Sequence, residues 1–129
     1  MWSVRILFLN LIYDKISLER HRYEIANMLK HNQCLEFLIL TNVEIGATGA
    51  MSLGKALKEN SSLRRLHIGH RVSINAHQDV DRTYPFQIGN HGMIALFSNH
   101  SLNLREIDLS CNGIGDEGIL PLIELLDTN

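Results

Sequence analysis

The chain has 129 residues, of which 45% are hydrophobic and 20% are charged. This balance is typical of a folded domain with its own core and excludes a disordered chain. The formal net charge of −2 gives no strong attraction to nucleic acid or to an anionic membrane, so we expect neither as a partner. The two cysteines, Cys34 and Cys111, suggest reduced thiols in a cytoplasmic protein rather than a disulfide framework.

An apolar stretch opens the chain. Residues 1–13 read MWSVRILFLNLIY, a basic and then apolar order that a signal peptide also has. Asn10 interrupts the apolar run, charged residues follow from Asp14, and no small-residue cleavage site appears. The run is also too short to cross a membrane as a helix. We therefore interpret this stretch as part of the fold.

Residues 35–60 and 104–129 align with one another without a gap. Each stretch has leucine or isoleucine at its first, fourth and sixth positions, as in a buried strand, and apolar residues four apart in its later half, as in a helix. The matching pairs are Leu35/Leu104, Leu38/Ile107, Leu40/Leu109, Ile45/Ile114, Gly46/Gly115, Gly49/Gly118, Leu53/Leu122, Leu57/Leu126 and Asn60/Asn129. The chain is therefore built from internal repeats.

Two further copies complete the pattern. One begins at Leu63 and carries an insertion at residues 71–87, and a weaker one begins at Val4. We therefore expect one domain over residues 1–129, with about four strand–turn–helix units at 4–34, 35–62, 63–103 and 104–129. The aligned positions are Leu63, Leu66, Ile68, Ile88, Gly89, Gly92 and Leu96 in the interrupted copy, and Val4, Leu7, Leu9, Ile25 and Leu29 in the weaker one.

These units resemble the leucine-rich-repeat family, and within it the ribonuclease-inhibitor-like class also seen in NOD-like receptors and tropomodulin-like proteins. The stretches CLEFLILTNVEIGATGAMSLGKALKENSS and LREIDLSCNGIGDEGILPLIELLDTN carry the resemblance. It implies an α/β fold, a right-handed horseshoe segment with a parallel sheet on the concave side and helices on the convex side. One position departs from the pattern, because Val43 stands where Asn112 would bond the turn through its side chain.

The resemblance also implies a role. Proteins of this class bind other proteins, so we expect a protein-interaction scaffold that has no cofactor and no catalysis of its own. One alternative is a regulator of another enzyme, of the inhibitor or small-GTPase-activator type. Another is a metal-dependent enzyme that uses the histidine-rich region around the insertion.

Side chains between the core leucines are expected to face the concave side, because successive residues of a strand point to opposite faces. This surface changes from apolar through basic to acidic along the stack, and it predicts where a partner protein binds. Two alternatives stay open: the N-terminal segment covers the apolar half, or the charged half consists only of cross-strand pairs, Arg65 with Glu106 and His67 with Asp108. The predicted contact residues are Ile6, Phe8, Phe37, Ile39, Arg65, His67, Glu106 and Asp108.

The insertion is polar and ends with the aromatic residues Tyr84 and Phe86. Long irregular loops often bind ligands, so these two residues are candidate anchors of a binding loop, and a tolerated surface insertion is the alternative. The region also holds His67, His70, His77, His91 and His100 with Asp79 and Asp81. Their spacing is not that of zinc ligands, and no catalytic or phosphate-binding motif appears, so we predict no metal site and no active site.

The helical halves of the second and fourth units differ in residue size. Gly54 and Ala56 align with Ile123 and Leu125, and small residues let neighbouring helices approach, whereas large ones need a cover. The last helical run, residues 119–126, is almost entirely apolar and is not followed by a polar cap. We therefore expect either a fragment of a longer solenoid or self-association through this helix. A curled end that buries these residues locally is the alternative.

Overall fold

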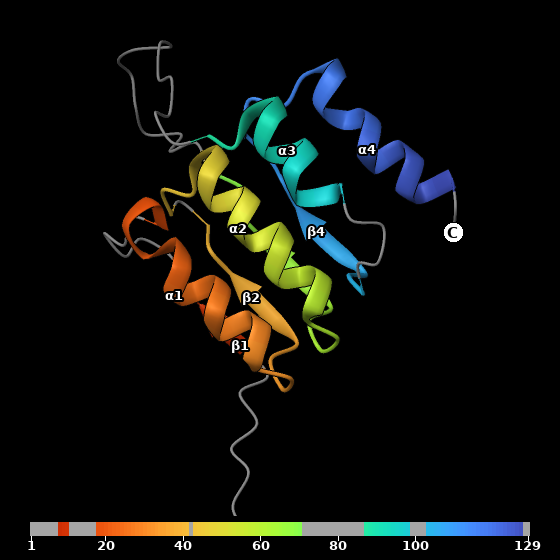
Figure 1. The fold of residues 1–129 in the computed structure, drawn as a ribbon. Helices are drawn as coiled ribbons and strands as arrows, with labels where there is room; N and C mark the ends of the chain where they lie inside the picture. The colour runs from red at the N-terminus through yellow and green to blue at the C-terminus, as the bar shows by residue number, and fades with distance from the viewer. Residues whose placement is uncertain (1–7, 11–17, 42, 71–86, 99–102, 128–129) are drawn as a thin grey trace, which may run out of the picture.

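The structure is a computed structural model, and it describes residues 8–10, 18–41, 43–70, 87–98 and 103–127. Strands and helices alternate along the chain and the strands are parallel, so the fold is α/β as predicted (Figure 1). The elements are β1 (Phe8–Asn10), α1 (Leu18–His31), β2 (Phe37–Ile39), α2 (Gly46–Glu59), β3 (Arg65–His67), α3 (Gly89–Phe97), β4 (Glu106–Asp108) and α4 (Asp116–Asp127).

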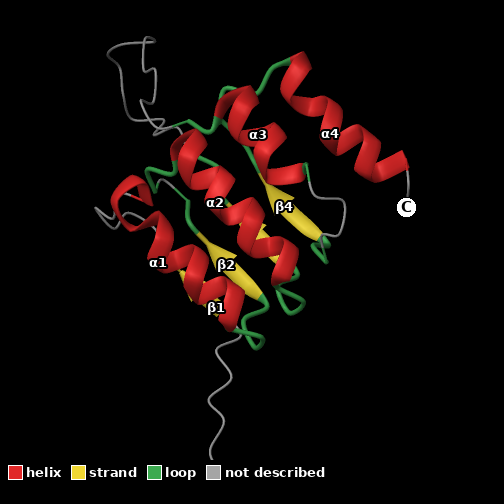
Figure 2. Ribbon diagram, in the orientation of Figure 1, coloured by secondary structure: helices red, strands yellow, loops and turns green. Residues whose placement is uncertain are grey.

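Within the described residues, the strands form one sheet in the order β1-β2-β3-β4. A helix follows each strand, and the helices lie side by side on the same face of the sheet (Figure 2). The register is the one that the leucine spacing predicts, because Leu38 pairs with Leu66 and Leu66 pairs with Ile107. Each unit therefore places its strand beside the strand of the next unit.

The core lies between the sheet and the helices. Leu38 and Leu66, the middle residues of β2 and β3, are completely buried, and so are Leu40 and Ile68 just after these strands. The helices cover them with Leu29, Leu53, Leu57, Met93, Leu96 and Phe97. Each leucine buried in this way contributes roughly 1.5–3 kcal/mol to the stability of the fold. The repeated apolar positions of the sequence are thus the residues that hold the units together.

The side chain of Asn60 joins successive units at the point where α2 ends and the chain turns toward β3. Asn60 is 3% exposed, and its Nδ2 donates hydrogen bonds to the carbonyl oxygens of Leu29 (2.6 Å) and Asn32 (2.7 Å). Its Oδ1 accepts from the backbone N–H groups of Ser62 (3.0 Å) and Leu63 (2.8 Å). A buried side chain that satisfies four backbone groups fixes the spacing between units.

The turns after β2 and β4 differ as the sequence predicts. Asn112 is 2% exposed, and its Nδ2 donates to the carbonyl oxygens of Ile68 (2.9 Å) and Leu109 (3.2 Å). Val43 occupies the aligned position with a completely buried apolar side chain, and its backbone N–H donates to the carbonyl of Leu40 (3.1 Å). The turn after β2 therefore uses apolar burial where the turn after β4 uses side-chain hydrogen bonds.

Glycines mark the closest approaches between helices. A Cβ on Gly54 would lie 2.6 Å from the carbonyl oxygen of Ala95, so only glycine lets α2 pack this closely against the backbone of α3. A Cβ on Gly118 would lie 2.9 Å from the Cα of Asn90, at the start of α3. The close approach of neighbouring helices expected at Gly54 is therefore present, and Gly118 makes a second close contact with the neighbouring unit.

The outer side of α4 is open. Leu122 and Leu125 pack partly against the core, whereas other large apolar side chains of the helix face away from it. The curled end that would bury the apolar residues of this helix is therefore wrong for the described residues. The exposed side chains are Ile119 (39%), Leu120 (56%), Ile123 (46%) and Leu126 (66%). The described part of the chain contains no helix with the length and apolar character needed to span a bilayer.

Candidate interaction surface

The sheet face opposite the helices carries the side chains that the sequence predicts for it. Phe37, Arg65 and Glu106 are aligned across β2, β3 and β4, and Ile39, His67 and Asp108 form the second aligned row. We call these six residues the strand-face surface. Phe37, Ile39, His67 and Asp108 are half-buried, and Arg65 and Glu106 are exposed. Backbone pairing continues the first row to Phe8 in β1, and Ile6 lies outside the described residues.

Direct contacts connect the apolar, basic and acidic parts of the strand-face surface. The guanidinium carbon of Arg65 lies 4.3 Å from the centre of the Phe37 ring, which is a cation–π contact. The His67 ring meets Phe37 edge to face, with centres 4.7 Å apart and planes at 75°. His67 Nε2 also lies 2.6 Å from Glu106 Oε1. The side-chain contact that His67 makes is therefore diagonal, with Glu106, rather than with Asp108 directly opposite.

These contacts leave polar groups available at the surface. A partly exposed His67–Glu106 pair contributes little stability, about 0–1 kcal/mol, because water screens it. Arg65 is exposed, and its contact with the Phe37 ring does not use the N–H groups of the guanidinium. The same residues can therefore offer donors, acceptors and an aromatic ring to another molecule at little cost to the fold.

The strand-face surface ends at a polar turn. The Asp108 carboxylate accepts hydrogen bonds from the backbone N–H (3.0 Å) and the hydroxyl of Ser110. Gly69 leaves room for this arrangement, because a Cβ there would lie 2.5 Å from Asp108 Oδ1. Beside it, His70 is 6% exposed and its backbone N–H donates to the Ser110 carbonyl (2.8 Å). Burial away from water lowers the pKa of His70 below its ordinary value of 6.5.

Comparison with known proteins agrees with this geometry. A family model described as "Leucine Rich repeat" matches residues 31–54 and 100–122, which contain β2 with the first part of α2 and β4 with the first part of α4. The chain carries leucine-rich repeats. This leucine-rich-repeat chain is similar to the solved structure of the Leiomodin-1 Actin-Binding Site 2 (ABS2), with a TM-score of 0.68 and 17% identity. The comparison with curated proteins gives no match.

The likeness to the leiomodin structure covers 96% of this chain and 65% of that one, so the leucine-rich-repeat chain spans about two thirds of its length. At 17% identity the likeness concerns the fold alone. The two segments that match the repeat model overlap the aligned stretches 35–60 and 104–129, so this match agrees with the alignment of their leucines.

The other candidate residues lie partly outside the described residues. Tyr84 and Phe86, the candidate anchors of the binding loop, lie outside them. Of the five clustered histidines, His67 lies on the strand-face surface, His70 is buried after β3 and His91 is exposed on α3. The described part of the chain holds no group of three His, Cys, Asp or Glu residues placed to bind a metal ion.

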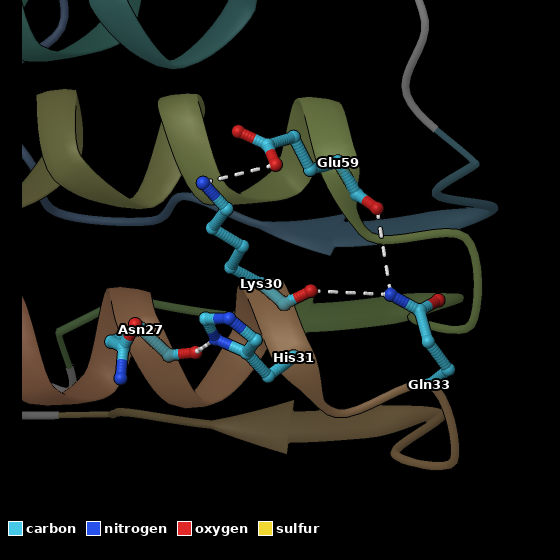
Figure 3. A network of polar contacts seen from close by, with 5 residues as sticks. All are labelled: Asn27, Lys30, His31, Gln33 and Glu59. Carbon is cyan, nitrogen blue, oxygen red and sulfur yellow. Dashed lines mark hydrogen bonds and ion pairs between the residues drawn. The ribbon is translucent and has the colours of Figure 1, made fainter.

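Sequence reasoning missed a groove of about 340 Å³ between α1 and α2, on the side of the helices away from the sheet. Lys30 of α1 pairs with Glu59 of α2 across it, with Nζ and Oε2 3.1 Å apart (Figure 3). Gln33 adds hydrogen bonds from its Nε2 to the carbonyls of Lys30 (3.3 Å) and Glu59 (3.4 Å). The repeat alignment places these helices side by side, but it does not reveal which side chains leave space between them.

Proposed function

We propose that the chain is a protein-interaction scaffold that binds a partner protein on its strand-face surface and has no catalysis of its own. The observation that carries the proposal is the connected set of Phe37, Arg65, His67 and Glu106, which meets solvent on the sheet face opposite the helices. The proposed surface extends to Phe8 and Ile6. In the right-handed, four-unit solenoid that we expect, this face is the concave one.

The order of charges defines the partner that would fit. Arg65 over Phe37 favours a partner with an acidic side chain beside an apolar one, because the pair offers a cation and an aromatic ring together. Glu106 and Asp108 favour a basic group at the other end of the contact. We therefore expect a partner surface whose charges alternate in sign across the width of the sheet.

Regulation of another enzyme is a second candidate, since an inhibitor or a small-GTPase activator would use the same surface to bind its target. The leiomodin structure is named as an actin-binding site, so actin is the first defined partner to test. The fold likeness is the only support for actin. The tests below therefore separate binding through the strand-face surface from the identity of the partner.

The experiment compares variants of the strand-face surface with a variant of the helical side. Binding to monomeric actin is measured by calorimetry, and binding to captured partners by interferometry. Phe37→Asp and Glu106→Lys should each weaken binding by about tenfold or more, as central aromatic and charged contacts do. Met51→Asp is the matched control, because Met51 is 45% exposed on α2 and lies away from the sheet.

Three results are informative. Loss of binding in Phe37→Asp and Glu106→Lys, with binding retained in Met51→Asp, supports the proposal. If a captured protein binds through Phe37 and actin does not bind, the scaffold function is supported and actin is rejected as the partner. A partner that binds both strand-face variants normally but is lost in Met51→Asp would move the interaction to the helices and overturn the proposal.

A further inference from the structure

Helix α4 carries large apolar side chains at positions that are covered in the unit before it. Ile119 is 39% exposed and Ile123 is 46% exposed. The aligned residues of α3 are Met93 and Phe97, which are 0% and 2% exposed where α4 packs beside α3. The same positions of the repeat are therefore buried when another helix follows and open on α4.

The second unit shows what covers these positions. In α2 they are Ala50, which is completely buried, and Gly54, which lies directly under the backbone of α3. Leu57 of α2 is 2% exposed, whereas the aligned Leu126 is 66% exposed. Ala50 and Gly54 contact α3, so the aligned Ile119 and Ile123 lie on the side along which one helix of this fold packs against the next. With the exposed Leu126 one turn further along, we call these residues the α4 outer stripe.

One other apolar position of the helices is exposed in α2, α3 and α4 alike. Met51, Ile94 and Leu120 occupy aligned positions in α2, α3 and α4, and all three are exposed, at 45%, 41% and 56%. This position faces solvent whether or not a further helix follows. The openness of the α4 outer stripe is thus specific to the stacking side, and Met51 and Ile94 provide matched controls for it.

The charged residues of helix α4 are Asp116, Glu117, Glu124 and Asp127, all acidic and all exposed. At 100° per residue, Asp116 and Asp127 lie beside the α4 outer stripe, whereas Glu117 and Glu124 lie on the side of the helix away from it. Asp116 is aligned with Asn90 of α3, whose Oδ1 accepts a hydrogen bond from the backbone N–H of Gly115 in the following unit (2.7 Å). Asp116 therefore carries hydrogen-bond acceptors at the position where Asn90 bonds the unit that packs against α3.

We propose that the α4 outer stripe binds an amphipathic helix of a partner protein, with an apolar stripe flanked by lysine or arginine. A helix is the element that covers the aligned side of α2 and α3, and basic flanks complement Asp116 and Asp127 beside the stripe. A second copy packed through the same stripe would bring like charges together, and an anionic lipid surface would be repelled in the same way. This surface is separate from the strand-face surface.

The test uses two designed 18-residue helical peptides with the same leucine stripe, one flanked by lysines and the other by glutamates. Fluorescence anisotropy measures their binding to the full chain and to its variants. We expect the lysine peptide to bind at least about tenfold more tightly than the glutamate peptide, and Ile123→Asp to weaken it by about tenfold. Asp116→Lys should weaken the lysine peptide and strengthen the glutamate peptide, a reversal that loss of folding cannot produce.

The controls separate this proposal from the proposed function. Ile94→Asp and Phe37→Asp should leave peptide binding unchanged, since neither residue lies on the α4 outer stripe. Equal binding of both peptides, or equal losses in Ile94→Asp and Ile123→Asp, would overturn the proposal. Sedimentation showing a dimer of the chain alone that Ile123→Asp dissociates would also overturn it, because the occupant would then be a second copy. Binding of phosphatidylserine vesicles that requires Ile123 would overturn it in favour of a membrane.

Discussion

The second and fourth units follow the same sequence pattern, yet they bury it to different extents. Leu38 in β2 and Leu53 in α2 are 0% and 1% exposed, whereas the aligned Ile107 and Leu122 are only half-buried. The second unit has a neighbour on each side, and the fourth packs against α3 and β3 alone in the described residues. The pattern of a single unit therefore specifies which side faces its neighbours, and the neighbours supply the burial.

The size of the residues on the stacking side differs between the same two units. At Gly54 the backbone of α3 approaches so closely that a Cβ would lie 2.6 Å from the Ala95 carbonyl oxygen, whereas the aligned Ile123 carries a large, exposed side chain. A surface with small residues fits a backbone that approaches closely, and a surface with large ones fits a partner that accommodates them. The second and fourth units are therefore built for different neighbours, despite their common leucines.

The largest effect is expected from shortening the middle residue of a strand. Leu66→Ala should lower the free energy of unfolding by about 2–5 kcal/mol, because Leu66 is completely buried and its loss leaves a cavity. Ile107→Ala should have a smaller effect, roughly 1–3 kcal/mol, since Ile107 is already partly exposed. Urea denaturation monitored by circular dichroism measures both values. Equal losses would contradict the difference in burial between the third and fourth units.

The next effect concerns the stacking side of the helices. Gly54→Ala should destabilise the fold by about 1–3 kcal/mol, because its Cβ would lie 2.6 Å from the Ala95 carbonyl oxygen and force the helices apart. Ile123→Ala, at the aligned position of α4, should change the stability by about 0.5 kcal/mol or less, as at other open surface sites. The same urea titrations test this pair. A large loss for Ile123→Ala would show that the side of α4 is already covered in the free chain.

Much of the fold could be predicted from the sequence, because leucine spacing reports directly on strand register. The alignment of Leu38 with Ile107 correctly predicted the register that pairs Leu38 with Leu66 and Leu66 with Ile107. Partners of individual side chains could not be predicted in this way. His67 was expected to pair with Asp108 but pairs with Glu106, because a long side chain reaches a diagonal neighbour as easily as a direct one.

Burial at the level of single helices also escaped prediction. The apolar run 119–126 indicated a helix that needs a cover, but the fraction exposed at Ile123 depends on packing against α3 that the sequence of α4 does not contain. The groove between α1 and α2 depends in the same way on two helices at once. Binding on the strand-face surface, and a binding role for Tyr84 and Phe86, stay predictions that the experiments above or a partner complex must test.

The smallest effect is expected from pH, at the boundary between the third and fourth units. Burial lowers the pKa of His70 in the folded chain, so the unfolded chain binds a proton at a higher pH than the folded one does. The stability that depends on neutral His70 is therefore complete above about pH 6.5 and is lost as the pH falls from there to the lower pKa of the folded state. His70→Gln should reduce the slope of unfolding free energy against pH in this window.

His70 is well placed to show whether the terminal unit responds first. Its backbone N–H donates to the carbonyl of Ser110 (2.8 Å), so a charged and newly hydrated His70 would disturb a contact between β3 and the turn that leads to α4. We expect hydrogen exchange at pH 5.5 to increase in residues 104–127 before it increases in α2, because the terminal unit packs against one neighbour in the described residues. His91→Gln, on the exposed surface of α3, controls for the removal of a histidine. If hydrogen exchange increases in residues 104–127 and in α2 at the same pH, the chain opens as one cooperative unit. The difference in burial would then produce no difference in local stability.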